Sequence, residues 1–424
     1  MKKLFIITIF SVVLFLLTVT DILRAEIAAQ LLEEDHCVSC HQEMELLPED
    51  FQDYDSHLQI GLSCSGCHGG DPTSEDPEKA MGAKAGFIGV PATKDIPQLC
   101  GRCHSNIDFM RTYQPRIPTD QEQQYFTSVH GKRLLKGDEK VAECASCHTA
   151  HAIVSAKDGR SSVYALNVPN TCKMCHSDPE YMKGYNIPTD QYEKYARSVH
   201  GKDLLENADT GAPACNDCHG NHGAAPPGVE SVAHVCGNCH VNNMNYFEAS
   251  AMAKPFANLE IHACEQCHGH HDVEKTSDDM VGVGENSVCT QCHSEGDAGY
   301  QVAQEMHKAI TEFVNEYNQA ETKLKDVQQK GMDDVDILYL LQEAHQTLIH
   351  TRTLVHTFNP DQIDEKTSDG IKKTSEALDL EKKEIRDYHI RRRGFGIATL
   401  FITILVIALF FKIRGMESNQ KKKS

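Results

Sequence analysis

Hydrophobic and polar positions divide the chain into stretches of different character. One apolar run covers residues 4–20, and a second covers residues 394–411 and contains no charged side chain. In 297–393, apolar residues recur at three- and four-residue steps, with only three glycines and one proline. That period is typical of amphipathic helices. Residues 36–296 show no sustained period, so we expect short helices and loops there.

The periodic region is expected to form three long helices. Their predicted ranges are about 297–329, 333–358 and 361–393, broken at Gly331-Met332-Asp333 and at Asn359-Pro360. The third helix leads directly into the apolar run. One stripe on the second helix is expected to pack against its neighbours, and it consists of Leu338, Leu341, His345, Leu348 and Arg352.

The two apolar runs predict export and a membrane anchor. Residues 1–25 have the lysines and apolar core of a signal peptide, although Leu23-Arg24-Ala25 is a weak cleavage site, so an uncleaved N-terminal anchor is an alternative. At about 1.5 Å per residue the second run spans roughly 27 Å, enough for one bilayer crossing at 394–412. Export of the N-terminal body places the basic tail, 413–424, in the cytoplasm.

Composition narrows the function further. The chain has 61 acidic and 41 basic residues and a formal net charge of −20, which argues against nucleic-acid binding through a basic surface. It also has 18 cysteines and 24 histidines. Every cysteine lies in a Cys-x-x-Cys pair, and every pair is followed directly by histidine.

These pairs form nine Cys-x-x-Cys-His motifs, the attachment signal for c-type haem. The two thiols reach the two vinyl groups of one porphyrin as thioethers, and the histidine becomes the proximal iron ligand. Disulfides, zinc sites and iron–sulfur clusters do not require histidine after every pair. We therefore expect nine covalently attached c-type haems. The attachment cysteines are Cys37, Cys40, Cys64, Cys67, Cys100, Cys103, Cys144, Cys147, Cys172, Cys175, Cys215, Cys218, Cys236, Cys239, Cys264, Cys267, Cys289 and Cys292, and the proximal ligands are His41, His68, His104, His148, His176, His219, His240, His268 and His293.

The motifs belong to an internal repeat that also supplies candidate distal ligands. Each unit reads Ser-x-His-Gly, haem motif, x-x-His, second haem motif, with two clear and two looser copies. The looser copies have Asp71 and Met252 where histidine is expected. Met252 is a ligand or a packing residue, with His262 as its substitute. The recurring distal candidates are His57, His130, His151, His200, His222 and His271. The helical region adds His307 and His356, for which His345 and His350 are substitutes.

The fold class follows from the number of motifs. From Cys37 to His293 the chain offers about 29 residues per motif, too few to build a separate pocket around each haem. We expect a mainly α protein. Its haem-packed domain, 36–296, has short helices and little other regular structure, and it precedes a long-helix bundle, 297–393, and one transmembrane helix. The haems themselves form the core and a continuous path for electrons, so this region is not expected to fold without them.

Over residues 36–393 the chain resembles the multihaem cytochromes c of bacterial respiration. The Ser-x-His-Gly … Cys-x-x-Cys-His-x-x-His unit before long helices is similar to that of the pentahaem nitrite reductase and octahaem hydroxylamine oxidoreductase superfamily. A terminal anchor is also found in quinol-linked tetrahaem cytochromes, although theirs is N-terminal. The resemblance implies electron transport in anaerobic respiration.

The chain departs from the enzymes of that superfamily. Ammonia-forming nitrite reductases have lysine after the second cysteine of the catalytic motif, and none of the nine motifs here does. Hydroxylamine oxidoreductases use a tyrosine cross-linked to the catalytic haem, and neither Tyr317, Tyr339 nor Tyr388 can be matched to it.

Two functions are therefore expected, in order. The first is an electron carrier on the periplasmic side of the cytoplasmic membrane. It would accept electrons from a quinol-oxidising, cytochrome b-like membrane subunit and pass them to soluble periplasmic partners. The alternative is an oxidoreductase acting on nitrite, hydroxylamine or tetrathionate at a five-coordinate haem. Asp71 and Met252 keep the alternative open, whereas the surplus of histidine ligands favours the carrier.

Overall fold

The computed structural model describes residues 35–47, 54–226 and 232–421. The predicted signal peptide, 1–25, lies outside them. The described residues form helices and contain no strand, which confirms the mainly α class. The chain divides into two compact units. Unit 1 comprises residues 1–228 and 268–275, and unit 2 comprises 229–267 and 276–424.

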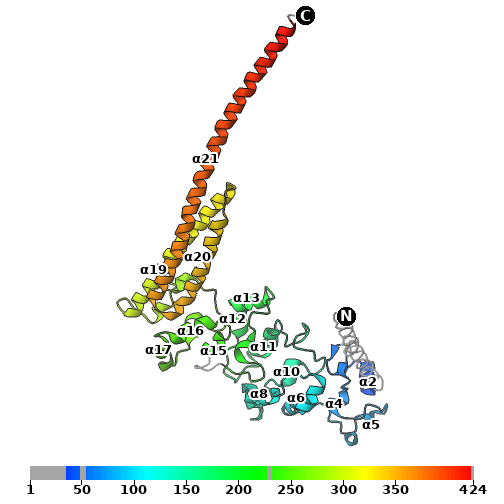
Figure 1. The fold of residues 1–424 in the computed structure, drawn as a ribbon. Coiled ribbons are helices and arrows are strands. Elements are labelled where there is room, and N and C mark those ends of the chain that lie inside the picture. Colours follow the sequence, from blue (N-terminus) through cyan, green and yellow to red (C-terminus); the bar gives the residue numbers. More distant parts are fainter. Residues whose placement is uncertain (1–34, 48–53, 227–231, 422–424) are drawn as a thin grey trace, which may run out of the picture. The chain divides into compact units, whose positions relative to one another are not determined.

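Unit 1 is built from short helices joined by turns, as Figure 1 shows for its blue-to-green segments. Its largest buried apolar clusters each contain three residues, Tyr125, Leu134 and Val141 in one and Val168, Leu204 and Ala214 in the other. Side chains alone thus form only small cores here. The elements are α2 (His36–Glu43), η1 (Leu58–Ile60), α4 (Cys64–His68), α5 (Pro77–Ala80), η2 (Ala83–Ala85), η3 (Thr93–Asp95), α6 (Ile96–His104), α7 (Ile107–Tyr113), α8 (Gln121–Thr127), α9 (Val129–Leu134), α10 (Cys144–His148), α11 (Val168–His176), α12 (Gln191–Arg197), α13 (Val199–Leu205) and α14 (Cys215–His219).

Unit 2 combines short helices with three long ones. The short elements are α15 (Val232–Gly237), α16 (Val241–Ala249), α17 (Ala253–Asn258), η4 (Asp278–Met280), η5 (Cys289–Gln291) and η6 (Val355–Thr357), and α18 (Ala263–His268) ends at the boundary between the units. The long elements are α19 (Ala298–Gln329), α20 (Val335–Leu354) and α21 (Pro360–Lys421). Their bounds agree with the predicted helices, and α21 continues through the apolar run as expected.

The three long helices pack side by side (Figure 1). Phe313 of α19 is fully buried at the centre, against Ala344 and Leu348 of α20. On α21, Gly370 makes room for this ring, because a Cβ there would lie 2.1 Å from Phe313 Cζ. A small residue opposite a large one thus sets the contact between α19 and α21.

The predicted stripe on α20 is partly wrong. Leu341 and Leu348 are buried, but Leu338 is 44 % exposed. His345 and Arg352 are exposed as well. The core face instead begins at Ile337 and includes Ala344. Since Ile337 and Leu338 are both apolar, the period alone cannot decide between the two neighbouring faces.

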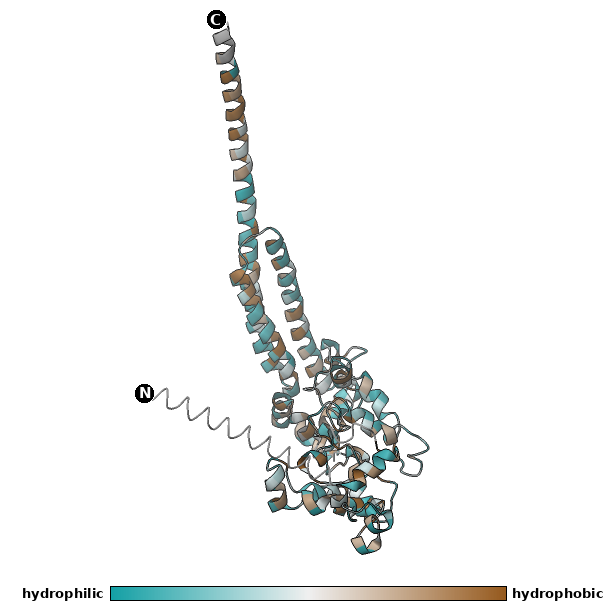
Figure 2. Cartoon of the chain, turned by 90° about the vertical axis from the view of Figure 1, so that its right-hand side faces the viewer, coloured by the Kyte–Doolittle hydropathy of each residue, from teal (hydrophilic) through white to brown (hydrophobic). Residues whose placement is uncertain are grey.

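The C-terminal part of α21 carries the hydrophobic run. It is the one helix among the described residues that is long and apolar enough to cross a membrane, and none of its apolar window is buried. Figure 2 shows the brown, hydrophobic residues along this end of the helix. Soluble proteins rarely leave so large an apolar surface uncovered. The helix is therefore compatible with a membrane anchor.

Candidate haem-ligand sites

Five pairs of imidazole rings face each other in unit 1. Each joins a motif histidine to a repeat histidine that the sequence analysis singled out as a distal candidate. The pairs, with the distances between ring centres, are His57 and His104 (6.1 Å), His68 and His151 (6.0 Å), His130 and His176 (6.1 Å), His148 and His222 (6.1 Å), and His219 and His271 (5.8 Å). The distances lie in a narrow range, whereas the angles between the ring planes vary from 11° to 85°, so the five pairs share one spacing but not one orientation.

This spacing fits an iron between the rings. A metal–imidazole bond is about 2 Å long, and C–N bonds of about 1.33 Å place the ring centre about 1.1 Å behind the ligating nitrogen. Two imidazoles on opposite sides of one metal ion therefore have ring centres about 6 Å apart. The residues present fit bis-histidine haem at these five motifs.

The protonation of the paired histidines also fits metal ligation. Burial, followed by the charge of the facing histidine, lowers the pKa of His130 and of His104 below the usual value. The same two causes act at His148, whereas at His271 burial comes first and brings the pKa to about 4. In these four rings the shift favours neutral imidazole, which is the form that binds metal.

One class of motif helix is five residues long and ends in a left-handed turn. α4, α10 and α14 each stop at the motif histidine, and the next residues, Gly69, Thr149 and Gly220, have φ values of 67°, 69° and 84°. The turn directs the chain away from the helix. As a result, the histidine three positions after the motif histidine faces the motif of the preceding repeat, as His151 faces His68 and His222 faces His148.

The other class is nine residues long and begins with a buried proline. Pro97 lies in the first turn of α6 and Pro169 in that of α11, where a missing N–H costs no helical hydrogen bond. Their motif histidines, at the helix C-terminus, face the first distal candidate of the same repeat, His57 for His104 and His130 for His176. The two classes therefore obtain their distal ligands by different routes.

Serine and glycine of Ser-x-His-Gly position the histidine between them. Ser128 Oγ donates to Tyr125 O (2.6 Å) and accepts from Gly131 N (2.9 Å), which caps α9. A Cβ on Gly131 would lie 2.1 Å from Tyr125 O, so only glycine permits this close approach. α13 repeats the arrangement with Ser198 and Gly201. His200 occupies in α13 the position of His130 in α9.

Sequence reasoning missed Asp55, which replaces the serine in the first repeat. This carboxylate is 4 % exposed. Its Oδ1 accepts from His57 N (2.9 Å) and its Oδ2 from Ile153 N (2.8 Å). Asp55 therefore joins the segments of two distal candidates, His57 and His151. The available signal was its offset, since it precedes His57 by two residues as Ser128 precedes His130.

The cysteines of consecutive motifs are neighbours in space. Hydrogen-bonded thiol pairs form between Cys100 and Cys144, and between Cys172 and Cys215, in unit 1, and between Cys236 and Cys264 in unit 2. Other consecutive motifs are close enough to interact electrostatically, namely through Cys37 with Cys64, Cys67 with Cys100, Cys147 with Cys172, and Cys267 with Cys289. Within each unit, these motifs follow one another in space in the order of the sequence.

The thiols do not resemble thiolate metal ligands. Burial raises the pKa of Cys64 and Cys147 to about 11, and burial with the nearby Asp35 raises that of Cys37 to about 12. The acceptors in the hydrogen-bonded thiol pairs are the exception, because the neighbouring S–H lowers their pKa. Zinc and iron–sulfur sites need thiolates, and the described residues contain no group of three or more His, Cys, Asp or Glu arranged around a bare metal ion. Thioether attachment fits these cysteines better.

The distal candidates of unit 2 are described by their local contacts and not by a pairing with a motif histidine. His356 lies in η6 with Nδ1 3.0 Å from Thr353 O, and burial is the main cause that lowers its pKa, with His240 contributing. His307 borders a cavity of about 720 Å³. His262 pairs with Glu265 (2.6 Å), and Met252 precedes α17 as its N-cap residue. Their roles as distal ligands stay predictions.

Comparison with known proteins agrees with a haem protein. Residues 56–177, which contain four of the nine motifs, match the family described as cytochrome c3. The match supports a multihaem cytochrome c. No curated protein and no solved structure matches the chain.

Proposed function

We propose that this chain is a nonahaem c-type cytochrome that relays electrons between a membrane donor and soluble acceptors. The five imidazole pairs, each at the spacing of a bis-histidine iron, carry the proposal. Haem supplies the one-electron redox chemistry. The chain supplies axial ligands, burial and spacing, which set the potentials.

Closed coordination favours transfer over catalysis at these five positions. An iron with histidine on both faces has no free site for substrate, whereas chemistry on a small molecule needs one. Backbone structure positions two of the distal candidates, His130 through the cap of α9 and His151 through the left-handed turn after α10. The chain thus keeps these ligands in place during oxidation and reduction.

The order of the motifs supports a relay. Because cysteines of consecutive motifs are in contact or close in each unit, the porphyrins attached to them are also neighbours. Electrons would pass from one motif to the next along the sequence.

The proposed donor is a quinol-oxidising, cytochrome b-like membrane subunit, because one exposed helix cannot enclose a quinol pocket alone. The haem region would then lie on the periplasmic side of the cytoplasmic membrane. The net charge of −20 favours basic soluble acceptors, with association rates that fall as salt increases.

A second candidate function is an oxidoreductase that acts on nitrite, hydroxylamine or tetrathionate. Asp71 and Met252 favour it, since each replaces a histidine of the repeat.

Reoxidation of the reduced, detergent-solubilised full chain separates the two functions. We expect a basic soluble cytochrome to reoxidise the haems at a rate that falls with salt, and we expect nitrite, hydroxylamine and tetrathionate not to be turned over. Sustained turnover of one of these three compounds, with no dependence on a protein acceptor, would contradict the relay.

A further inference from the structure

A backbone contact recurs along unit 1 and defines where each distal ligand is delivered. The residue before a Ser-x-His-Gly-type histidine donates its N–H to a carbonyl in the next repeat. The three copies are Ser56 N to Ile153 O (2.8 Å), Val129 N to Ala224 O (3.0 Å) and Val199 N to Val273 O (2.9 Å).

The accepting residue has the same relation to a distal histidine each time. It lies two positions after His151, His222 or His271. That histidine faces the first motif histidine that follows the donating segment, as His151 faces His68 and His271 faces His219. The contact therefore marks which iron receives its ligand from the following repeat.

A fourth copy of this contact lies at the start of unit 1. Asp35 caps α2 by accepting from Cys37 N (2.9 Å), just as Asp55 accepts from His57 N. His36 N then donates to Pro72 O (2.8 Å). The first motif histidine after this donor is His41, so the segment around Pro72 is placed to serve the iron of the Cys37 motif.

This segment carries no imidazole. Three residues after His68 stands Asp71, and two residues before the accepting carbonyl stands Gly70. Asp71 Oδ1 accepts from Thr73 N (3.0 Å) and Thr73 Oγ1 (2.7 Å), which holds the side chain as a hydrogen-bonded carboxylate. The copy that serves His41 thus has glycine at the position counted from the carbonyl and a carboxylate at the position counted from the motif, whereas in the other three copies both counts lead to the same histidine.

We propose that the iron of the Cys37 motif keeps its sixth position open to a small exogenous ligand, and that Asp71 selects neutral, N–H- or O–H-bearing ligands over anions. A carboxylate on that side accepts a hydrogen bond from such a ligand and repels an anion. The site goes beyond the relay, which needs only closed irons.

Electron paramagnetic resonance of the oxidised full-length holoprotein in detergent tests this assignment, with imidazole and azide as probes at pH 8. We expect a high-spin ferric signal that imidazole converts to low-spin at a lower concentration than azide does. Asp71→His is expected to remove that signal from one iron per chain, whereas Asp71→Ala improves azide affinity about tenfold, as loss of one nearby like charge does. Asp108→His, a change to an exposed aspartate on α7 outside the contact, serves as the matched control.

Three results would overturn the assignment. The first two are a wild type without a high-spin signal and a high-spin signal that Asp71→His leaves unchanged. If Asp71→His does not retain its haems, Asp71→Ala decides, and an unchanged ratio of imidazole to azide affinity rejects the role of Asp71. The proposed relay has a separate readout, the low-spin signals of the five paired irons. If the relay proposal fails, those signals will be missing, whatever the outcome at Asp71.

Discussion

Substitution of Gly131 by alanine tests how the Ser-x-His-Gly segment holds its histidine. A Cβ at this position would lie 2.1 Å from Tyr125 O and 2.8 Å from the Cα of Phe126. Close carbon–oxygen contacts in proteins are about 3.3 Å. α9 must therefore move away from the end of α8 by about 1.2 Å to accept the methyl group.

That movement exceeds what the neighbouring ligand tolerates. His130 precedes Gly131 directly, and its ring is 6.1 Å from that of His176, which leaves room for two metal–nitrogen bonds and no slack. A bond of about 2 Å does not lengthen by half its length and remain a bond. We expect His130 to leave the iron of the Cys172 motif.

The assay is integrated electron paramagnetic resonance of the oxidised holoprotein. Gly131→Ala should convert one low-spin iron per chain to high-spin without loss of haem. Gly159→Ala is the matched control, because a Cβ at Gly159 meets nothing within 4 Å, and it should leave the spectrum unchanged. If Gly131→Ala keeps every iron low-spin, glycine is not what places His130, and the contact with Tyr125 O is relieved by another movement.

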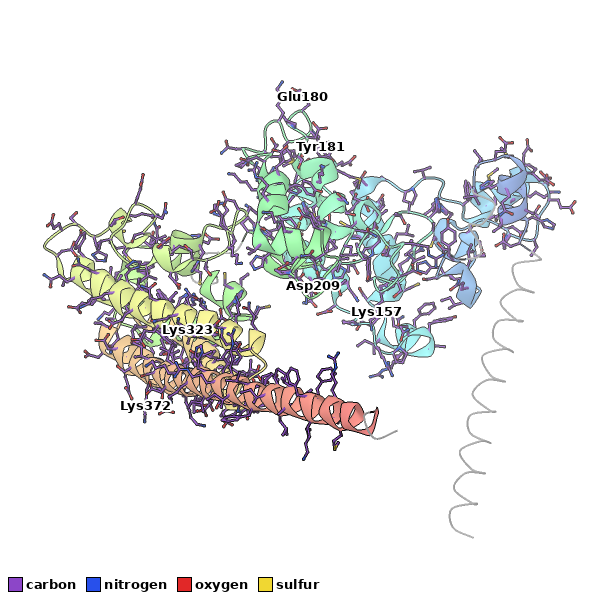
Figure 3. The ribbon with its side chains drawn as sticks, turned by 90° about the horizontal axis from the view of Figure 1, so that it is seen from above. Lys157, Glu180, Tyr181, Asp209, Lys323 and Lys372 are labelled. Carbon is purple, nitrogen blue, oxygen red and sulfur yellow. The ribbon has the colours of Figure 1, made fainter. Side chains whose placement is uncertain are left out.

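Further predictions concern a ligand, a buried acid and the cofactor. His222→Ala should convert the iron at the Cys144 motif to high-spin, and added imidazole should restore the low-spin signal. The control His36→Ala should change no spin state. Glu381 of α21 is 2 % exposed, and neither of its carboxylate oxygens has a hydrogen-bond partner. Burial raises the pKa of Glu381 to about 7, and the positive charge of Lys323 on α19, labelled in Figure 3, partly opposes this increase. Because this folded-state pKa lies above the unfolded value, the contribution of Glu381 to stability is fully present below about pH 4.5 and is lost as the pH rises through 7, by about 3 kcal/mol. Glu381→Gln should remove that slope in thermal unfolding followed by circular dichroism, while Glu376→Gln should not. Chain produced without haem attachment should lack a compact fold in 36–296, and a cooperative unfolding transition there would contradict a haem-built core.

The repeat could be predicted from the sequence, but the pairing of each distal histidine with its motif could not. His130, His151 and His222 recur at fixed offsets from the motifs, which identified them as distal candidates. Which iron each one serves depends on contacts between distant segments, such as His222 with His148, and local spacing does not specify these. The left-handed turn at Thr149 was equally hidden, since threonine does not mark such a turn as Gly220 does.

In the helical region, too, local features could be predicted from the sequence and long-range contacts could not. Long apolar periods and the break at Asn359-Pro360 predicted three helices and the continuation of α21, because helix limits depend on local sequence. The buried face of α20 depends instead on its neighbours, and so Leu338 was assigned to the core in place of Ile337.

The five histidine pairs are proposed to ligate haem iron from both faces. Near-infrared magnetic circular dichroism of the oxidised, detergent-solubilised holoprotein, quantified against total haem, tests this proposal most directly, because this spectrum distinguishes bis-histidine iron from other ligation. We expect nine haems per chain and at least five low-spin, bis-histidine irons. Fewer than five such irons in a protein with its full haem content would contradict ligation by the five histidine pairs.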